Sequence, residues 1–165
     1  MRPLVLAALL LAPAVPDLRA LDVSGTYEAA GKVLSQPDGP AGGPVSLRAL
    51  LALEFDHERA AVIHEATVRV KLEQAARSFR IKCLDGEGAA TWQHEWKLHE
   101  GYDSDKEKVR LLLRYPTKEE PGLLFLLRLG ERNELLTVEI QRVTHAWYGA
   151  AFKPAGTFYF LRALE

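Results

Sequence analysis

Cysteine is almost absent from this chain of 165 residues, which contains Cys83 alone. A single cysteine excludes an intrachain disulfide, so an apolar core must stabilise the fold. A surplus of one charge is also missing, because 21 Lys and Arg face 22 Asp and Glu, for a net charge of -1. Proteins that bind nucleic acid through its phosphates usually carry a basic surplus or a basic stripe. Nucleic acid is therefore not an expected partner.

The common catalytic and ligand-binding motifs are missing too. The chain has no G-x-S-x-G turn, and the Gly-rich stretch at residues 39–44 contains prolines and lacks the lysine of a phosphate loop. His94 and His99 are five positions apart, whereas a zinc-binding helix needs histidines four apart. Cys83 lies in an apolar alternating run that favours a buried thiol over a nucleophile. We therefore assign no catalytic residue, metal ligand or cofactor, and an enzymatic function is not the favoured hypothesis.

No apolar run approaches the roughly 20 residues that span a bilayer as a helix. The longest, Leu4 to Val15, is interrupted by Pro13, follows the positive Arg2, and precedes the small residue Ala20. This pattern is typical of a secretory signal peptide. We predict a signal peptide at residues 1–20 and export of a single domain, residues 21–165, to the periplasm or the extracellular space, without a permanent membrane anchor.

The rest of the chain shows apolar residues at every second position, the period of half-buried strands. Between residues 60 and 74 the even positions carry Ala60, Val62, His64, Ala66, Val68, Val70 and Leu72, while the odd ones include Glu65, Thr67, Arg69, Lys71 and Glu73. Three later runs follow the same rule. The positions expected to face the interior in those runs are Phe79, Ile81 and Cys83; Val109, Leu111, Leu113 and Tyr115; and Leu136, Val138 and Ile140. The closing segment 156–165 is rich in aromatic and branched residues, which suits a final strand.

Short polar or Gly/Pro-rich segments separate these runs and predict tight turns. They occupy residues 56–59, 85–88, 101–106, 116–122, 130–133 and 153–156. Eight to ten strands joined by tight turns predict an all-β antiparallel up-and-down meander closed into a barrel, because closure removes the two exposed edges. A two-sheet β-sandwich is the alternative. The Gly- and Pro-rich composition of residues 35–44 predicts a mobile loop.

Two segments fit the alternation poorly. Residues 46–55 are rich in Leu and Ala and suit a helical stripe as well as a strand, and we interpret them as a strand. Residues 123–129 are apolar at almost every position. This pattern predicts a strand that is covered on both faces.

The stretch "ATWQHEWKLHE" at residues 90–100 carries the most distinctive chemistry. In a strand, Trp92, His94 and Trp96 share one face. Two indoles flanking a histidine suit either a packed core with one hydrogen-bonded histidine or the wall of a ligand cavity. His64 is expected on the inner face of its own strand, as is His94, so the pair is a weaker candidate for an acid and base.

The first segment after the predicted signal peptide, "LDVSGTYEAAG" at residues 21–31, and the closing "GTFYFLRALE" together resemble the lipocalin-like (calycin) barrels. In that family the first strand carries Gly-x-aromatic, which Gly25, Thr26 and Tyr27 match, and a late arginine packs on the aromatic ring, which Arg162 matches. The resemblance implies an exported barrel that holds a small apolar ligand in its interior.

Three functional hypotheses follow. The leading one is a monomeric barrel that binds a small hydrophobic or amphipathic molecule in an interior cavity. The second is a structural or interaction protein with a filled core and an outer apolar patch of Leu123, Phe125, Leu127 and Leu129. The third is an enzyme that uses His64 and His94. The predicted cavity wall consists of Trp92, His94, Trp96, His64, Tyr27, Tyr115 and Tyr159.

Overall fold

The described residues form one sheet of mostly antiparallel strands, in which the last strand is hydrogen-bonded to the first. The computed structural model describes residues 20–37, 41–52, 67–146 and 149–164. Its elements are β1 (Gly25–Ser35), β2 (Pro44–Ser46), α1 (Leu47–Ala52), β3 (Arg69–Ala75), β4 (Ser78–Leu84), β5 (Ala90–Leu98), β6 (Gly101–Ser104), β7 (Val109–Arg114), β8 (Gly122–Leu129), the 3₁₀ turn η1 (Glu131–Asn133), β9 (Leu135–Ala146) and β10 (Gly149–Arg162). The predicted all-β fold is confirmed.

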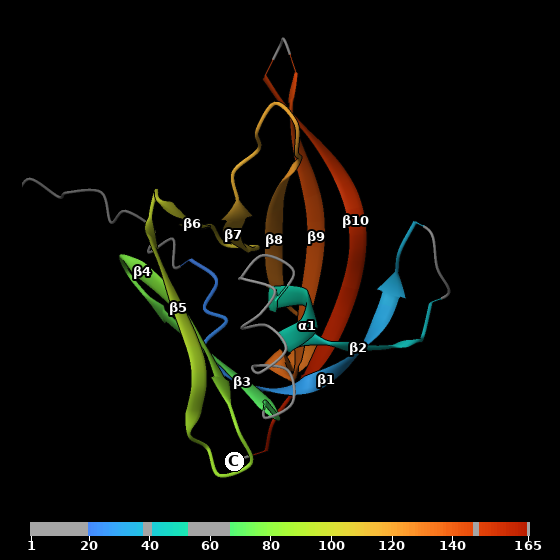
Figure 1. Ribbon diagram of the computed structural model, residues 1–165. Helices are drawn as coiled ribbons and strands as arrows, with labels where there is room; N and C mark the ends of the chain where they lie inside the picture. The colour runs from blue at the N-terminus through green and yellow to red at the C-terminus, as the bar shows by residue number, and fades with distance from the viewer. Residues whose placement is uncertain (1–19, 38–40, 53–66, 147–148, 165) are drawn as a thin grey trace, which may run out of the picture.

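All ten strands belong to one sheet in the order β10-β9-β8-β7-β6-β5-β4-β3-β1-β2, and β10 also pairs with β1. This last pairing is antiparallel and closes the sheet into a ring of hydrogen-bonded strands. In Figure 1, β3, β4 and β5 form one wall, β8, β9 and β10 form the opposite wall, and α1 lies between them. The sheet formed by the described strands is continuous, so these strands do not form a two-sheet sandwich.

The β5–β6 junction keeps the ring continuous between β4 and β7. These two strands pair in parallel through Lys97 with Gly101 and Leu98 with Tyr102. Since β5 pairs with β4 and β6 pairs with β7, they are two halves of one kinked strand that changes neighbours. Among the described strands, the ring therefore has eight positions, because β2 lies outside it and β5 and β6 together occupy one position. Eight positions give an interior just wide enough to be filled by side chains or to hold one small ligand.

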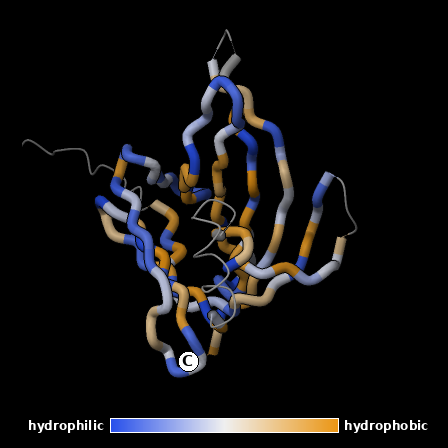
Figure 2. Tube along the Cα trace, viewed as in Figure 1, coloured by the Kyte–Doolittle hydropathy of each residue, from blue (hydrophilic) through white to orange (hydrophobic). Residues whose placement is uncertain are grey.

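The predicted alternation decides which residues form the core. Val70, Phe79, Ile81, Cys83, Leu136, Val138 and Ile140 are all 5% exposed or less and belong to one apolar cluster. The charged residues between them face outward, where Lys82 pairs with Glu73 at 2.9 Å and Arg80 with Glu95 at 3.1 Å. Figure 2 shows the resulting alternation of hydrophobic and hydrophilic positions along the strands.

The interpretation of residues 46–55 as a strand is wrong. Leu47–Ala52 form the helix α1, and Leu47, Leu50 and Leu51 are each 7% exposed or less within the core cluster. A helix places residues i, i+3 and i+4 on one side, so these three leucines cover the interior together. The end of the predicted segment, residues 53–55, lies outside the described residues.

Three of the predicted turns need correction or cannot be placed. Residues 85–88, 116–122 and 130–133 lie between strands as expected, apart from Gly122, the first residue of β8. Residues 101–104 instead form β6, and the turn follows at residues 105–108. Residues 153–156 lie inside β10, where the pairing with β9 shifts between Pro154 and Gly156, so the Gly/Pro signal marks a bulge. Residues 56–59 lie outside the described residues.

The remaining N-terminal predictions concern segments that are described only in part. The predicted loop at residues 35–44 connects β1 to β2, and Gly42 donates its N–H to the carbonyl of Val33 at 2.7 Å. Of the predicted strand 60–74, residues 60–66 lie outside the described residues and β3 begins at Arg69. Among the described residues, no helix is long and apolar enough to cross a membrane.

Candidate functional site

An aromatic ladder lines the inner face of β5. Trp92, His94 and Trp96 pair across the antiparallel β4–β5 ladder with Cys83, Ile81 and Phe79, respectively. Directly paired residues share a face of the sheet. Because Cys83, Ile81 and Phe79 are core residues, the three ladder side chains point to the interior. The predicted common face is therefore confirmed.

The rings of the aromatic ladder touch in sequence. Trp92 and His94 are stacked with ring centroids 6.0 Å apart and an interplanar angle of 8°. His94 and Trp96 form an edge-to-face contact with centroids 4.4 Å apart and an angle of 70°. The imidazole is thus held between two indoles, which fixes its plane.

Burial differs along the aromatic ladder. Trp96 is 5% exposed, whereas Trp92 and His94 are only half-buried. Their partners on β4, Cys83 and Ile81, are 1% and 2% exposed. The inner face of β5 therefore keeps some accessible aromatic surface beside a strand whose inward side chains are fully covered.

His94 is the titratable group of the aromatic ladder. Burial among the indoles lowers its pKa from the ordinary value of 6.5. Desolvation disfavours the charged imidazolium, so the neutral ring predominates near pH 7. A neutral imidazole offers one hydrogen-bond donor and one acceptor rather than a positive charge.

Trp96 also connects β5 to β7 beside the β5–β6 junction. Its Nε1–H donates to the carbonyl oxygen of Leu112 on β7, 3.2 Å away. Gly101 permits this crossing, because a Cβ at that position would lie 3.0 Å from Cδ1 of Trp96 and the residue has φ +101°. The inner end of the aromatic ladder is therefore part of the structural frame.

Tyr27 points inward as predicted, and it belongs to the core. Its side chain is 0% exposed, and its hydroxyl donates to the carbonyl of Val23 at 2.9 Å. The guanidinium carbon of Arg162 lies 5.8 Å from the centre of the ring. Arg162 also donates to the carbonyl oxygens of Ser24 and Asn133.

Two predicted members of the cavity wall do not face the interior. Tyr115 is 64% exposed, because β7 ends at Arg114 after a register shift that breaks the alternation. Tyr159 lies between the inward Phe158 and Phe160 on β10 and pairs with Thr137 on the outer face. His64 lies outside the described residues, so its pairing with His94 stays a prediction.

The prediction of an outer apolar patch on β8 is wrong, because its residues lie on the inner face of the strand. Leu123, Phe125 and Leu127 are 6%, 1% and 2% exposed within the core, and Leu129 packs against it. The even-numbered Leu124 and Leu126 face outward instead. Leu126 is nevertheless only 5% exposed and lies outside the core cluster, so the outer face of this strand is covered at Leu126, whereas Leu124 lines an open groove.

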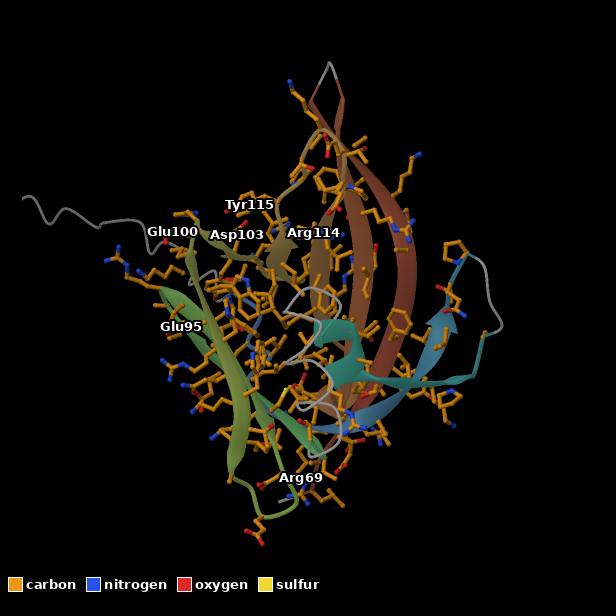
Figure 3. The ribbon with its side chains drawn as sticks, viewed as in Figure 1. Arg69, Glu95, Glu100, Asp103, Arg114 and Tyr115 are labelled. Carbon is orange, nitrogen blue, oxygen red and sulfur yellow. The ribbon has the colours of Figure 1, made fainter. Side chains whose placement is uncertain are left out.

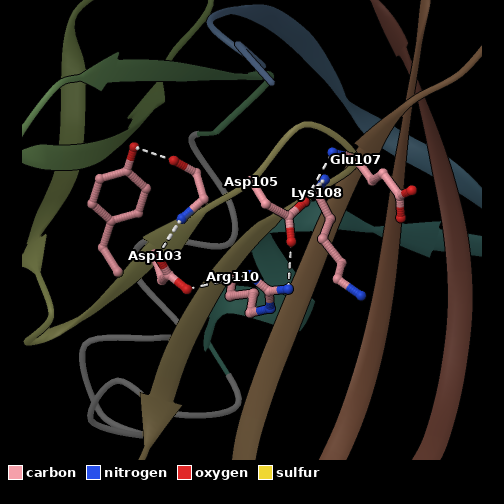
Figure 4. Close-up of polar contacts among 7 residues, drawn as sticks. Asp103, Asp105, Glu107, Lys108 and Arg110 are labelled. Atoms are coloured by element: carbon pink, nitrogen blue, oxygen red, sulfur yellow. Dashed lines mark hydrogen bonds and ion pairs between the residues drawn. The ribbon is translucent and has the colours of Figure 1, made fainter. Parts of the chain in front are cut away.

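An open groove of about 410 Å³ crosses this outer face. Its apolar part is formed by Leu112, Leu124, Val143, Phe152, Tyr115 and Pro116. Figure 3 shows Tyr115 near Asp103, which lines the same groove. Figure 4 shows Arg110 reaching both Asp103 and Asp105. The backbone N–H groups of Glu107 and Lys108 and the guanidinium of Arg110 lower the pKa of Asp105.

Cys83 has the features of a structural thiol. It is 1% exposed, and burial raises its pKa from 9.0 to about 11. The nucleophilic thiolate is therefore scarce at neutral pH. Among the described residues, no group of three or more His, Cys, Asp and Glu is arranged to hold a metal ion.

The sequence analysis missed one residue with evident binding chemistry, Arg48. It is the only charged residue between Val45 and Leu53, which was a readable signal. In the structure it lines a second groove, formed by β1, β2 and the beginning of α1.

Comparisons with known proteins leave the family open. No protein-family model matches the chain. No curated protein matches it in sequence.

Proposed function

We propose that this protein is an exported binding module that takes up a small hydrophobic or amphipathic molecule against the inner face of β5. The observation that carries the proposal is the incomplete burial of Trp92 and His94 on a face whose neighbouring strand β4 is fully covered. Exposed aromatic surface with one convergent polar group is typical of small-molecule sites. The remaining inward aromatics, such as Phe79 and Tyr27, serve the core.

The aromatic ladder suggests the chemistry of the ligand. A flat apolar ring can stack on Trp92, and aromatic pairs contribute about 0.5–1.5 kcal/mol beyond the burial of area. The neutral His94 can exchange one hydrogen bond with a hydroxyl or carbonyl group on that ring. A planar molecule with one or two polar substituents therefore fits best.

Two further features support a lipocalin-like protein, which is part of the proposal. Arg162 lies over the ring of Tyr27, the contact that the resemblance implies. Residues 1–20 have the composition of a secretory signal peptide. Export would be tested by N-terminal sequencing of the protein from its own cells, where a first residue at or near Leu21 is expected.

Tryptophan fluorescence tests the binding site. The third tryptophan, Trp147, lies outside the described residues, so the titration is best made in a Trp147→Phe background that leaves Trp92 and Trp96 as the reporters. We expect the flavonoid quercetin to quench this emission saturably. Loss of stacking in Trp92→Ala should weaken binding up to about tenfold.

The matched control is Gln93→Ala, on the same strand but the opposite, exposed face. It should bind quercetin as the parent protein does, and N-acetyltryptophanamide corrects for absorption by the probe. A linear response without saturation, or equal affinities for the Trp92→Ala and Gln93→Ala variants, would count against the proposal.

A further inference from the structure

A second groove opens where β1 exchanges one partner strand for another. β1 pairs with β3 from Gly25 to Glu28 and with β2 from Ala30 to Lys32. Between these two pairings lies a groove of about 490 Å³. This volume is within the range of small-molecule sites.

The lining of this groove is mainly apolar, with a few polar groups. The apolar residues are Ala29, Ala30, Pro44, Val45 and Val68. The polar residues are Glu28, Ser46, Arg48 and Thr67. Val68 is 48% exposed, so part of the apolar wall faces solvent.

Arg48 is the unusual member of this lining. Its Nη1 donates to the carbonyl oxygen of Thr67 at 2.7 Å, and the side chain is half-buried. Its Nε is buried without a hydrogen-bond acceptor among the described residues. None of the ion pairs between described residues includes Arg48.

The half-buried guanidinium of Arg48 forms no ion pair with a carboxylate of the described residues. Buried charges are normally paired, because desolvation of an isolated charge is costly. The carbonyl of Thr67 is a neutral acceptor and does not balance the charge. An anion that enters the groove would do so through charge-assisted hydrogen bonds.

We propose that the groove between β1, β2 and α1 binds a small amphipathic monoanion, with a carboxylate against Arg48 and an aliphatic tail along Val45 and Val68. The apolar lining favours an organic anion over an inorganic one. Glu28 lines the same groove, and its negative charge disfavours a multiply charged ligand. This site is separate from the aromatic ladder and goes beyond the proposed function.

Isothermal titration of the purified protein with sodium octanoate, 1-octanol and sodium sulfate tests the proposal. Octanol has the same chain without the charge, and sulfate has charge without the chain. We expect octanoate to bind at least about tenfold more tightly than either, since only octanoate combines a charge-assisted hydrogen bond to Arg48 with an aliphatic chain.

Variants assign the binding to Arg48. R48Q should weaken octanoate binding about tenfold or more, and R48K should retain part of it because the charge remains. K153Q removes one exposed positive charge on β10 outside the groove and should bind as the parent protein does. V68D tests the same site without altering Arg48: the added carboxylate should weaken octanoate binding, whereas the neutral V68S should weaken it less.

The proposal is overturned if octanol or sulfate binds as tightly as octanoate, or if R48Q and V68D both leave octanoate binding unchanged. Far-UV circular dichroism confirms that each variant folds. These experiments also distinguish failure of this proposal from failure of the proposed ligand binding at the aromatic ladder. Octanoate binding that depends on Arg48, without quercetin quenching of Trp92 and Trp96, would refute the proposed function and support this site.

Discussion

The guanidinium carbon of Arg162 lies 5.8 Å from the centre of the Tyr27 ring. This contact joins the last strand of the ring to the first, beside the β1–β10 pairing of Tyr27 with Arg162. Gly25 leaves room for it, because a Cβ at residue 25 would lie 2.8 Å from Nε of Arg162. The last strand, β10, therefore stabilises the first, β1, through Arg162. This side chain covers the Tyr27 ring and donates hydrogen bonds to two backbone carbonyls.

Replacement of Arg162 should destabilise the fold. Arg162→Met removes the cation–π contact and the hydrogen bonds to Ser24 and Asn133, and should lower the free energy of unfolding by about 1–2 kcal/mol in urea titrations. The free energy of unfolding of Arg162→Lys should lie between those of the parent protein and Arg162→Met, because lysine keeps the charge but lacks the planar guanidinium. Equal stability of Lys153→Met and Arg162→Met would contradict a specific role.

The pKa of His94 should be below 6.5 in the folded protein, because burial lowers it. Protonation then favours the unfolded state, so the contribution of His94 to stability is fully present above pH 6.5 and is lost as the pH falls through the folded-state pKa. Proton NMR titration of the imidazole Hε1, assigned with a His94→Gln variant, measures the pKa. A value of 6.5 or above would be inconsistent with a desolvated imidazole.

Cys83 should be inert while the protein is folded. Its thiol is 1% exposed with a pKa raised by burial to about 11, so iodoacetamide at pH 8 should modify it at least about tenfold more slowly than in denaturant. Mass spectrometry over time provides the rates. Comparable rates in both states would show that the thiol is accessible.

The same pKa predicts an alkaline loss of stability. The contribution of the protonated thiol is fully present below pH 9.0, the ordinary pKa, and is lost as the pH rises towards 11. The loss amounts to at most about 3 kcal/mol for two pH units. It should appear as a difference between the parent protein and Cys83→Ala in urea titrations at pH 8, 9 and 10. A constant difference across this range would refute the assignment.

The α1 leucines should be essential for stability. Leu51 is 3% exposed in the core cluster, and Leu51→Ala should lower the free energy of unfolding by about 2–4 kcal/mol. Leu34 is 46% exposed on β1, so Leu34→Ala should change it by less than about 0.5 kcal/mol. Similar effects of the two substitutions in urea titrations would argue against insertion of α1 into the core.

Alternation was a reliable guide wherever both strand neighbours are regular. Phe79, Ile81 and Cys83 could be assigned to the interior from sequence because a strand turns every second side chain to the same face. The common face of Trp92, His94 and Trp96 followed by the same rule. The stacking of His94 on Trp92 and its edge contact with Trp96 required the rotamers that packing selects.

The errors have local causes. Tyr115 was expected inside because the alternation was extended through a register shift and past the end of β7. Tyr159 was assigned to the cavity wall, but aromatic residues occupy three consecutive positions, 158–160, and only the pairing with β9 determines which of them point inward. Residues 47–52 became a helix because the three leucines at helical spacing meet an interior that accepts them.

The order of residues by itself determined the all-β class, the polar and apolar faces of most strands and the lack of disulfide support, since these depend on side-chain period and composition. Tertiary structure alone decided the pairing of β10 with β1, the stacking of His94 between Trp92 and Trp96 and the exposure of Arg48 to a groove. The alternation of side chains does not specify these features, because they depend on how the whole sheet curves and closes and on the rotamers that packing selects.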